Sequence, residues 1–191
     1  MRLILASASP RRAEILRDAG IAFEVLPVTI DESRWRDEGP AHLVRRLAQT
    51  KAAAAAAQAS GPAIVLGADT EVAVDDEVLG KPGSPLDAQE MLRCLSGRTH
   101  KVITGFELQR LPDRATRSEE EITMVTFAPL SDEEIRAYVD TREPCDKAGS
   151  YAIQGRGGRF ITRIEGCYFN VVGLPLARVY HALLDFGWTP E

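Results

Sequence analysis

The sequence predicts an α/β protein with a mixed sheet, because strand and helix signals alternate along its whole length. Short apolar runs bounded by turn residues are typical of buried strands, and longer segments of good helix formers separate them. With 191 residues and 45% hydrophobic content, the chain is long enough for one well-packed domain and marginal for two. Apart from one alanine-rich helix, it contains no repeat, linker or low-complexity tract. We therefore expect a single domain over residues 1–191.

Start and stop signals place the elements of the first half. Ser9 followed by Pro10 is a typical helix start, and Gly20 is a typical helix end. Pro40 begins a run of good helix formers that ends at Ser60-Gly61-Pro62. In order, the expected elements are a strand at 3–6, a helix at 10–19, a strand at 22–27, a polar loop at 29–39, a helix at 40–59, a buried strand at 63–68, and an exposed hairpin or edge strand at 71–79 that turns at Asp75 and Asp76.

Capping patterns place the helices of the second half. Ser84 with Asp87, and Ser131 with Glu134, have the spacing of a capping box, and Ser96-Gly97 is a typical helix end. In order, the expected elements are a helix from 84 to 96, alternating strands at 100–110 and 120–128 around a charged loop, a helix from 131 to 141, a glycine-containing segment with short strand-like pieces at 144–170, and a last helix from 175 to 187.

Composition narrows the class of protein. A net charge of −5 and a pI near 5.3 argue against a general nucleic-acid binder or a membrane-surface binder. Cys94, Cys145 and Cys167 are odd in number and widely spaced, which fits a reducing compartment better than a disulfide framework. The N-terminus meets serine and two arginines too soon for a signal peptide, and no apolar stretch approaches the roughly 18 residues of a membrane span. We expect a soluble, cytoplasmic protein without nucleic-acid or membrane partners.

Residues 7–12, with the sequence Ser-Ala-Ser-Pro-Arg-Arg, predict an anion site. Arg11 and Arg12 fall in the first helical turn, where the positive end of the helix dipole disfavours each cation by about 0.3–1 kcal/mol. Backbone N–H groups, hydroxyls and guanidinium groups together suit a phosphate. The alternative is a surface helix start with two solvated arginines, and this motif alone does not decide between them.

Lys51 interrupts an otherwise apolar helix face. At about 100° per residue, it lies within the arc of Leu43, Val44, Leu47 and Ala48. Its aliphatic stem could snorkel past the edge of the core. The other interpretation is that the helix delivers an ammonium group into a cleft, where it meets a phosphate.

Two acidic residues are candidates for catalysis. Asp69 follows the expected strand at 63–68, and the carboxyl end of such a strand is where open α/β sheets place their ligands. It could serve as a base or a metal ligand, or only bond its own backbone in a turn. Glu32 sits beside Asp31 in a polar loop and could be a second metal ligand, although a solvated loop is the default.

Other motifs are weak one at a time. Lys81 lies between a glycine and a proline that restrict its backbone, but the phosphate-binding loop pattern GxxxxGK[ST] is absent. Residues 96–100 could bind phosphate, although a helix end is the favoured interpretation. Gln154 offers an amide that both donates and accepts hydrogen bonds, which suits reading a base edge.

Together these segments resemble the Maf family of nucleoside triphosphate pyrophosphatases. The resemblance runs nearly end to end, and eight short motifs in the same order make it specific. They are residues 7–12, Asp31-Glu32, Lys51-Ala52, Gly67-Ala68-Asp69-Thr70, Gly80-Lys81-Pro82, residues 96–100, residues 146–155 and residues 170–175.

The resemblance implies an elongated α/β fold of two lobes with a central cleft, related to the inosine triphosphatase-like fold. It also implies cytoplasmic enzymes that hydrolyse a nucleoside triphosphate to monophosphate and pyrophosphate with a divalent metal, Mg²⁺ or Mn²⁺, often as homodimers. The Ala-Asp-Thr sequence is similar to the branch that acts on dTTP and UTP, whereas the branch that acts on 7-methyl-GTP usually has Ser-Asp there.

The resemblance also assigns roles to residues of this chain. Glu32 and Asp69 would hold the metal, and Asp69 would deprotonate the water that attacks the α-phosphorus. The positions that set specificity in the family correspond to Arg12, Thr70 and Gln154. The expected catalytic residues are Asp69, Lys51, Lys81, Arg11, Arg12 and Glu32, and the expected substrate-binding residues are Ser7, Ser9, Arg12, Thr70 and Gln154.

Two alternatives stay open. One is a pyrophosphatase for 7-methyl-GTP or related purine nucleotides. The other is a nucleotide-binding regulator of septum formation without significant turnover, which has little use for a carboxylate that activates water.

Overall fold

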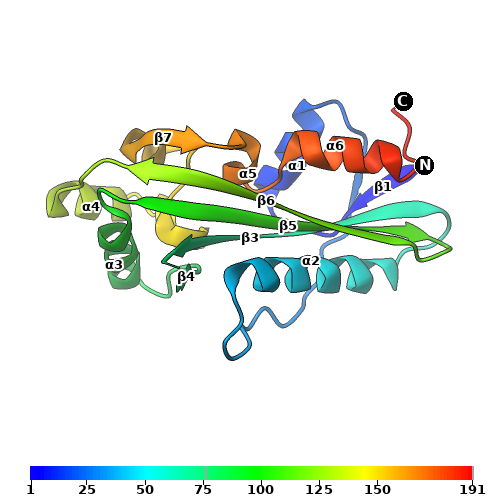
Figure 1. The fold of residues 1–191 in the computed structure, drawn as a ribbon, viewed down its shortest axis with the longest axis horizontal. Helices are drawn as coiled ribbons and strands as arrows, with labels where there is room; N and C mark the ends of the chain where they lie inside the picture. The colour runs from blue at the N-terminus through cyan, green and yellow to red at the C-terminus, as the bar shows by residue number, and fades with distance from the viewer. Residues whose placement is uncertain (76, 191) are drawn as a thin grey trace.

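Seven strands form one mixed sheet in the computed structural model, which describes residues 1–75 and 77–190 (Figure 1). Their order is β2-β1-β3-β5-β6-β7, and β4 pairs with β3. The first strand is parallel to both of its neighbours, and the other pairs are antiparallel, so the expected mixed sheet is confirmed. The strands are β1 (Arg2–Leu5), β2 (Glu24–Val25), β3 (Ala63–Val74), β4 (Glu77–Leu79), β5 (Thr99–Leu111), β6 (Thr116–Phe127) and β7 (Ile161–Glu165).

The helices begin close to the expected signals. The Ser131–Glu134 capping box is fully formed, and the Ser84 hydroxyl accepts a bond from the Asp87 backbone nitrogen at 3.1 Å. In the described residues no helix is both long and apolar enough to span a bilayer. The α-helices are α1 (Pro10–Asp18), α2 (Pro40–Ala56), α3 (Pro85–Leu95), α4 (Asp132–Val139), α5 (Tyr168–Val172) and α6 (Leu176–Asp185), and the 3₁₀ turns are η1 (Glu143–Asp146), η2 (Ala148–Ser150) and η3 (Arg156–Phe160).

The expected strand end at residue 68 is wrong. β3 continues through Asp69 to Val74, because β5 pairs with it in unbroken register from Ala63 to Ala73. Residues 72–74 are buried, so the expectation that the whole of 71–79 is exposed is also wrong. The expected hairpin partner is present as β4, and the turn expected at Asp75 and Asp76 includes a position that lies outside the described residues.

Two other segments differ from expectation. The strand expected at 22–27 is reduced to the two residues of β2. The segment 144–170 contains β7, as expected for a strand-like piece, but the rest of its regular structure is three 3₁₀ turns and the first residues of α5. Backbone bonds three residues apart, such as Lys147 N–H to Pro144 C=O at 3.2 Å, close these turns.

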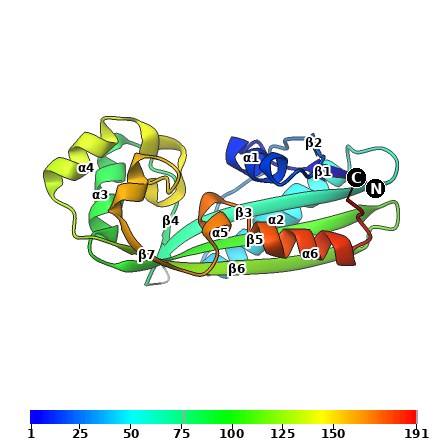
Figure 2. The ribbon, with the colours of Figure 1, turned by 90° about the horizontal axis from the view of Figure 1, so that it is seen from above.

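The molecule is elongated and has two lobes (Figure 2). One lobe carries α1, α2 and α6, the other carries α3, α4 and the 3₁₀ turns, and the long strands β3, β5 and β6 run through both. Each lobe has its own hydrophobic core. Examples are Leu16, Leu66 and Leu183 in the first, and Leu92, Phe127, Tyr138 and Phe160 in the second. The expected two-lobed architecture is confirmed, and the assignment of residues 1–191 to one domain stays a prediction.

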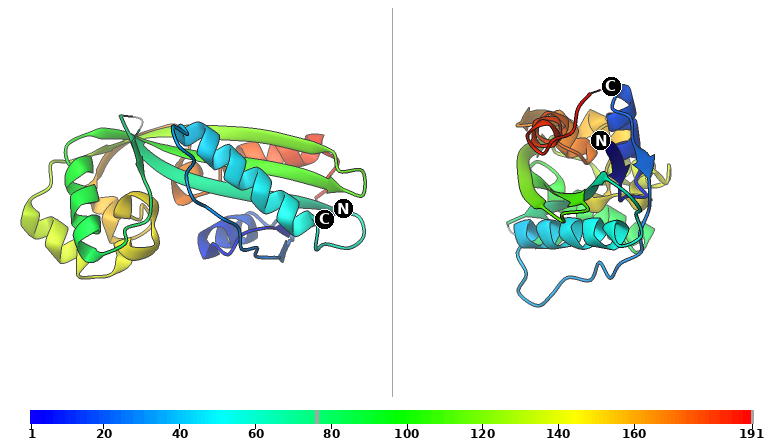
Figure 3. Two further views of the ribbon diagram at one scale, coloured as in Figure 1. Left: turned by 90° about the horizontal axis from the view of Figure 1, so that it is seen from below. Right: turned by 90° about the vertical axis from the view of Figure 1, so that its right-hand side faces the viewer.

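Two glycines bring α2 unusually close to the sheet. This helix covers one face of the sheet, and α6 lies on the opposite face (Figure 3). A Cβ at Gly67 would collide with the Ala48 carbonyl oxygen and lie 2.7 Å from the Ala52 backbone nitrogen. A Cβ at Gly105 would lie 2.8 Å from the carbonyl oxygen of Val44. Because neither strand has a side chain there, α2 packs directly on the backbone of β3 and β5.

Candidate active site

A cleft of about 340 Å³ lies between the two lobes. Its lining includes the start of α1 from one lobe and residues 146–148 and 151–154 from the other. Figure 2 shows α1 on the side of its lobe that faces the other lobe. Every site residue expected from the sequence lines this cleft. They are Ser7, Ser9, Arg11, Arg12, Glu32, Lys51, Asp69, Thr70, Lys81 and Gln154.

Lys51 joins the two expected metal-binding carboxylates. Its ammonium nitrogen lies 2.6 Å from Glu32 Oε1 and 2.6 Å from Asp69 Oδ1. Lys51 and Asp69 are 8% and 7% exposed, so this contact is shielded from water. The helical wheel placed Lys51 on the buried face correctly, and the close packing of α2 at Gly67 lets it reach β3. The Lys51 ammonium group therefore lies in the cleft, and its partners in this structure are the carboxylates of Glu32 and Asp69.

Among the described residues that line the cleft, two buried carboxylate oxygens have no hydrogen-bond partner. They are Asp69 Oδ2 and Glu71 Oε2, and both residues line the cleft. Unpartnered carboxylate oxygens are the donors that Mg²⁺ and Mn²⁺ prefer, so Asp69 with the half-exposed Glu32 fits a divalent cation. Within the described part of the chain, no three acidic, histidine or cysteine side chains are grouped as a ready-made metal site.

Glu71 is a cleft residue that the sequence reasoning missed. Burial, together with the negative charges of Asp69 and Glu32, raises its pKa to about 8. It is therefore mostly protonated at neutral pH, which reduces repulsion between neighbouring carboxylates. A signal was available, because residues two apart in a strand lie on the same face. Because the strand was expected to end at residue 68, this period was not extended from Asp69 to Glu71.

Arg12 is held rigidly inside the cleft wall. Its Nε donates to the Gly173 carbonyl oxygen at 2.8 Å, Nη1 to Ser7 Oγ at 3.1 Å and Nη2 to Thr70 Oγ1 at 2.9 Å. Burial lowers its pKa, and the charge of Asp69 opposes that change. A guanidinium has five N–H donors, so these three bonds leave two for a ligand. Arg12 thus links three segments and still presents its charge to the cleft.

A second group of cations lies at the opening between the lobes. Arg11 pairs with Asp146 across the cleft at 3.3 Å, and Lys147 contacts the same carboxylate at 2.6 Å. Lys81 is exposed and has no hydrogen-bond or ion-pair partner in residues 1–75 and 77–190. Ser9 occupies the N-cap position of α1, but its side chain makes no capping bond. Lys81 and the Ser9 hydroxyl are therefore open to an incoming anion, whereas Arg11 and Lys147 are paired with Asp146.

Residues 96–100 end a helix, as the favoured interpretation expected. Ser96 and Gly97 follow α3, and His100 is buried beside the cleft-lining Tyr151. The His100 Nε2 lies 2.8 Å from the Tyr151 hydroxyl. The alternative of a phosphate loop has no support, since none of these five residues lines the cleft.

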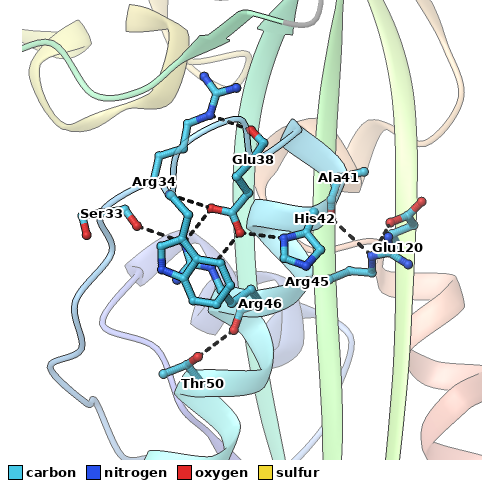
Figure 4. A network of polar contacts seen from close by, with 10 residues as sticks. Ser33, Arg34, Glu38, Ala41, His42, Arg45, Arg46, Thr50 and Glu120 are labelled. Atoms are coloured by element: carbon cyan, nitrogen blue, oxygen red, sulfur yellow. Dashed lines mark hydrogen bonds and ion pairs between the residues drawn. The ribbon is translucent and has the colours of Figure 1, made fainter.

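The loop that carries Glu32 is tied to α2 by a buried carboxylate (Figure 4). Glu38 is 5% exposed and accepts two bonds from Arg46, at 2.7 and 2.8 Å, and one from the Trp35 backbone at 3.1 Å. The bonds from Arg46 lower the pKa of Glu38 to about 2, although burial opposes the shift. Arg46 also donates to the Ser33 carbonyl at 2.9 Å. The same helix therefore positions both Lys51 and the loop beside it.

Comparison with solved structures defines the fold class. A HAM1 protein from Coxiella burnetii superposes with a TM-score of 0.50 and 18% identity, covering 97% of this chain and 99% of that one. The two proteins share a fold.

The family follows from the sequence. The family described as Maf-like protein matches residues 2–186, and the chain belongs to it. A relative from Symbiobacterium thermophilum is 53% identical over 98% of this chain and 95% of its own length. Another from Carboxydothermus hydrogenoformans is 47% identical over 98% of this chain and all of its own length. Both are named dTTP/UTP pyrophosphatase, and the resemblance to the Maf family is confirmed.

Proposed function

We propose that this protein is a nucleoside triphosphate pyrophosphatase that hydrolyses dTTP and UTP to the monophosphate and pyrophosphate. The observation that carries the proposal is the meeting of the Asp69 and Glu32 carboxylates with the cations of residues 7–12 and Lys81 in one cleft. The names of relatives at 47–53% identity support the same activity.

Asp69 is the proposed general base. Its unpartnered Oδ2 accepts a proton from the attacking water. The water oxygen forms a bond to the α-phosphorus while the bond from that phosphorus to the bridging oxygen breaks, and this oxygen leaves with pyrophosphate. Lys51 holds Oδ1 of the same carboxylate, so the free oxygen is fixed in orientation.

The cations bind the triphosphate. Arg11, Arg12 and Lys81 neutralise phosphate charge, and Ser7 and Ser9 supply hydroxyl groups at the helix start. Glu32 and Asp69 are the residues that would hold Mg²⁺ or Mn²⁺, which when bound supplies positive charge against the phosphate oxygens. An anionic substrate must displace Asp146 from Arg11, because the pair lies across the cleft.

We assign recognition of the nucleotide base to the side of the cleft opposite the start of α1. Gln154 is exposed there, and its amide has no partner among the described residues. A pyrimidine with an imide edge offers one donor between two acceptors, which an amide can match. Thr70 lies on the other side of the cleft, where its hydroxyl accepts a bond from Arg12 and supports the phosphate-binding group.

The family resemblance also favours a homodimer that works in the cytoplasm. We include both in the proposal. Light scattering of the purified protein measures the first directly.

A substrate panel tests the activity. Purified protein is incubated with dTTP, UTP and 7-methyl-GTP in Mg²⁺ or Mn²⁺, and pyrophosphate release is measured. The proposal expects release from dTTP and UTP at a kcat/KM above that for 7-methyl-GTP. Preference for 7-methyl-GTP would favour the purine alternative, and tight binding of all three without release would favour the regulator.

A further inference from the structure

A buried phenol and a partly buried carboxylate hold the segment around Gln154 from both sides. The Tyr138 hydroxyl accepts a bond from the Ala152 backbone nitrogen at 3.1 Å. Glu143 accepts from the backbone nitrogens of Arg156 and Gly157, each at 3.0 Å. Tyr138 also donates its own proton to Glu143 at 2.8 Å. Gln154 lies two residues from the nearest bond on each side, at the apex of the held segment.

Glycines allow this approach. A Cβ at Gly155 would lie 2.5 Å from Glu143 Oε1, and a Cβ at Gly157 would lie 2.6 Å from the Tyr138 hydroxyl oxygen. Real Cβ atoms essentially never come so close to another heavy atom. The segment can therefore pack on the carboxylate and the phenol only because both positions lack side chains.

The clamp formed by Tyr138 and Glu143 is rigid. Tyr138 is fully buried, and its ring meets Phe160 edge-to-face at 5.1 Å between centroids. Burial raises the pKa of Tyr138, so its hydroxyl keeps the proton that it donates. Burial alone would raise the pKa of Glu143, but the bonds from Arg156 and Gly157 lower it below its usual value. The carboxylate is charged at neutral pH and accepts all three bonds.

The clamp belongs to one lobe, and the proposed general base Asp69 is held by Lys51 of the other lobe. Tyr138 lies on α4 and Glu143 on η1, whereas Lys51 and the start of α1 lie in the first lobe (Figure 2). The clamp residues do not line the cleft themselves. Their side-chain hydrogen bonds reach the cleft through residues 152–157, which bring Gln154 to its wall, and the Glu143 carbonyl oxygen also accepts a bond from the cleft residue Lys147 at 2.7 Å.

We propose that Tyr138 and Glu143 are positioning residues for base selection, because they fix the backbone on both sides of Gln154 so that its amide meets the base in one orientation. This inference rests on the proposed function and adds to it the residues that set its selectivity. It predicts that loosening the clamp relaxes the choice of base and leaves the hydrolytic step unchanged.

The first variant is Tyr138→Phe, which removes one hydroxyl and keeps the ring in its apolar site. KM for dTTP should rise about 5- to 10-fold, the change expected when one or two buried hydrogen bonds are lost, while kcat stays within about twofold of wild type. The ratio of kcat/KM for dTTP to that for dGTP should fall by a similar factor.

Glu143→Gln is the second variant, because it keeps the size of the side chain but places an amide donor against a backbone N–H. It should shift the same ratio in the same direction. Tyr180→Phe, on α6 in the other lobe, removes a hydroxyl that makes no hydrogen bond within the described residues and should leave the ratio at the wild-type value. Urea unfolding of each variant shows that the comparison is made on folded protein.

The outcomes separate this inference from the function on which it rests. If the wild type releases pyrophosphate from dTTP but both variants keep the wild-type base ratio, the clamp has no part in selectivity and the inference is overturned. A loss of kcat on every nucleotide in equal proportion would also overturn it, because that result marks a structural role only. If the wild type releases no pyrophosphate from any nucleotide, the proposed function fails and the inference fails with it.

Discussion

At the level of single side chains, burial separates the cleft groups that are fixed in position from those that are free to move. Lys51, Arg12 and Asp69 are all less than 9% exposed, and each contacts a charged or polar neighbour, although Asp69 Oδ2 has no partner among the described residues. Lys81 and Gln154, by contrast, are open to solvent and without partners among the described residues. The buried set is fixed in position and still offers Asp69 Oδ2 and two Arg12 donors to a ligand, and the exposed set is free to adjust to that ligand.

His100 makes the stability of the protein depend on pH. Burial lowers its pKa from 6.5 to about 4, so the folded protein holds the neutral ring while the unfolded chain takes up a proton below about pH 6.5. The contribution is complete above pH 6.5 and is lost as pH falls towards 4. From pH 7 to pH 5, this group should lower the free energy of unfolding by about 2 kcal/mol.

Urea unfolding at the two pH values measures the effect. His100→Gln should show a smaller decrease than wild type, and His181→Gln, an exposed histidine on α6, should behave like wild type. An equal decrease in wild type and His100→Gln would contradict the assignment.

At the level of elements, α2 is the part that assembles the acidic side of the site. It carries Lys51 to Asp69, and it holds the loop of Glu32 through Arg46 and Glu38. The Arg46 guanidinium also lies 4.2 Å from the centre of the Trp35 ring, so the loop contains its own fluorescent reporter.

Arg46→Gln should release this loop. It removes a charge partner from the buried Glu38, and we expect a red shift of Trp35 emission in a Trp188→Phe background. Since Glu32 is then less well positioned, kcat should fall about tenfold or more. Arg45→Gln, next to it on the same helix and paired with Glu120 instead, is the matched control. Unchanged emission and unchanged kcat in Arg46→Gln would show that the loop holds its place without this contact.

Gly67→Ala should force α2 away from the sheet. The new Cβ meets backbone atoms that cannot move aside without shifting the helix, so the free energy of unfolding should fall by about 3 kcal/mol. Gly80→Ala adds the same methyl group where nothing lies within 4 Å and should change stability by less than about 0.5 kcal/mol. Denaturant titration of the two variants compares them, and equal stabilities would mean that α2 adapts freely.

The sequence patterns located most elements but not their extent. Caps and prolines predicted the starts of α1, α2, α3 and α4, because these signals act within a few residues. They could not predict that β3 runs on through Asp69 and Glu71, because its length is set by pairing with β5, about 35 residues later in sequence. Glu71 was missed for that reason.

At the level of the whole molecule, the two lobes contribute different residues to the cleft. The first presents residues 7–12, Lys51 and the carboxylates Glu32 and Asp69. The second presents Lys81, Asp146, Lys147 and Gln154, and the strands β3, β5 and β6 run through both lobes. The residue types in the cleft could be proposed from motifs. Their convergence depends on contacts such as Arg11 with Asp146, between positions 135 residues apart, which no local pattern encodes.

The measurement that tests the account most directly is the turnover of Asp69→Asn on dTTP, with kcat and KM determined from pyrophosphate release. The substitution keeps the shape of the side chain but removes the carboxylate that takes the proton from water. We predict a fall in kcat of about 10²- to 10⁴-fold with KM within a few-fold of wild type, and no such fall in Asp75→Asn. Near-wild-type kcat in Asp69→Asn would contradict the account.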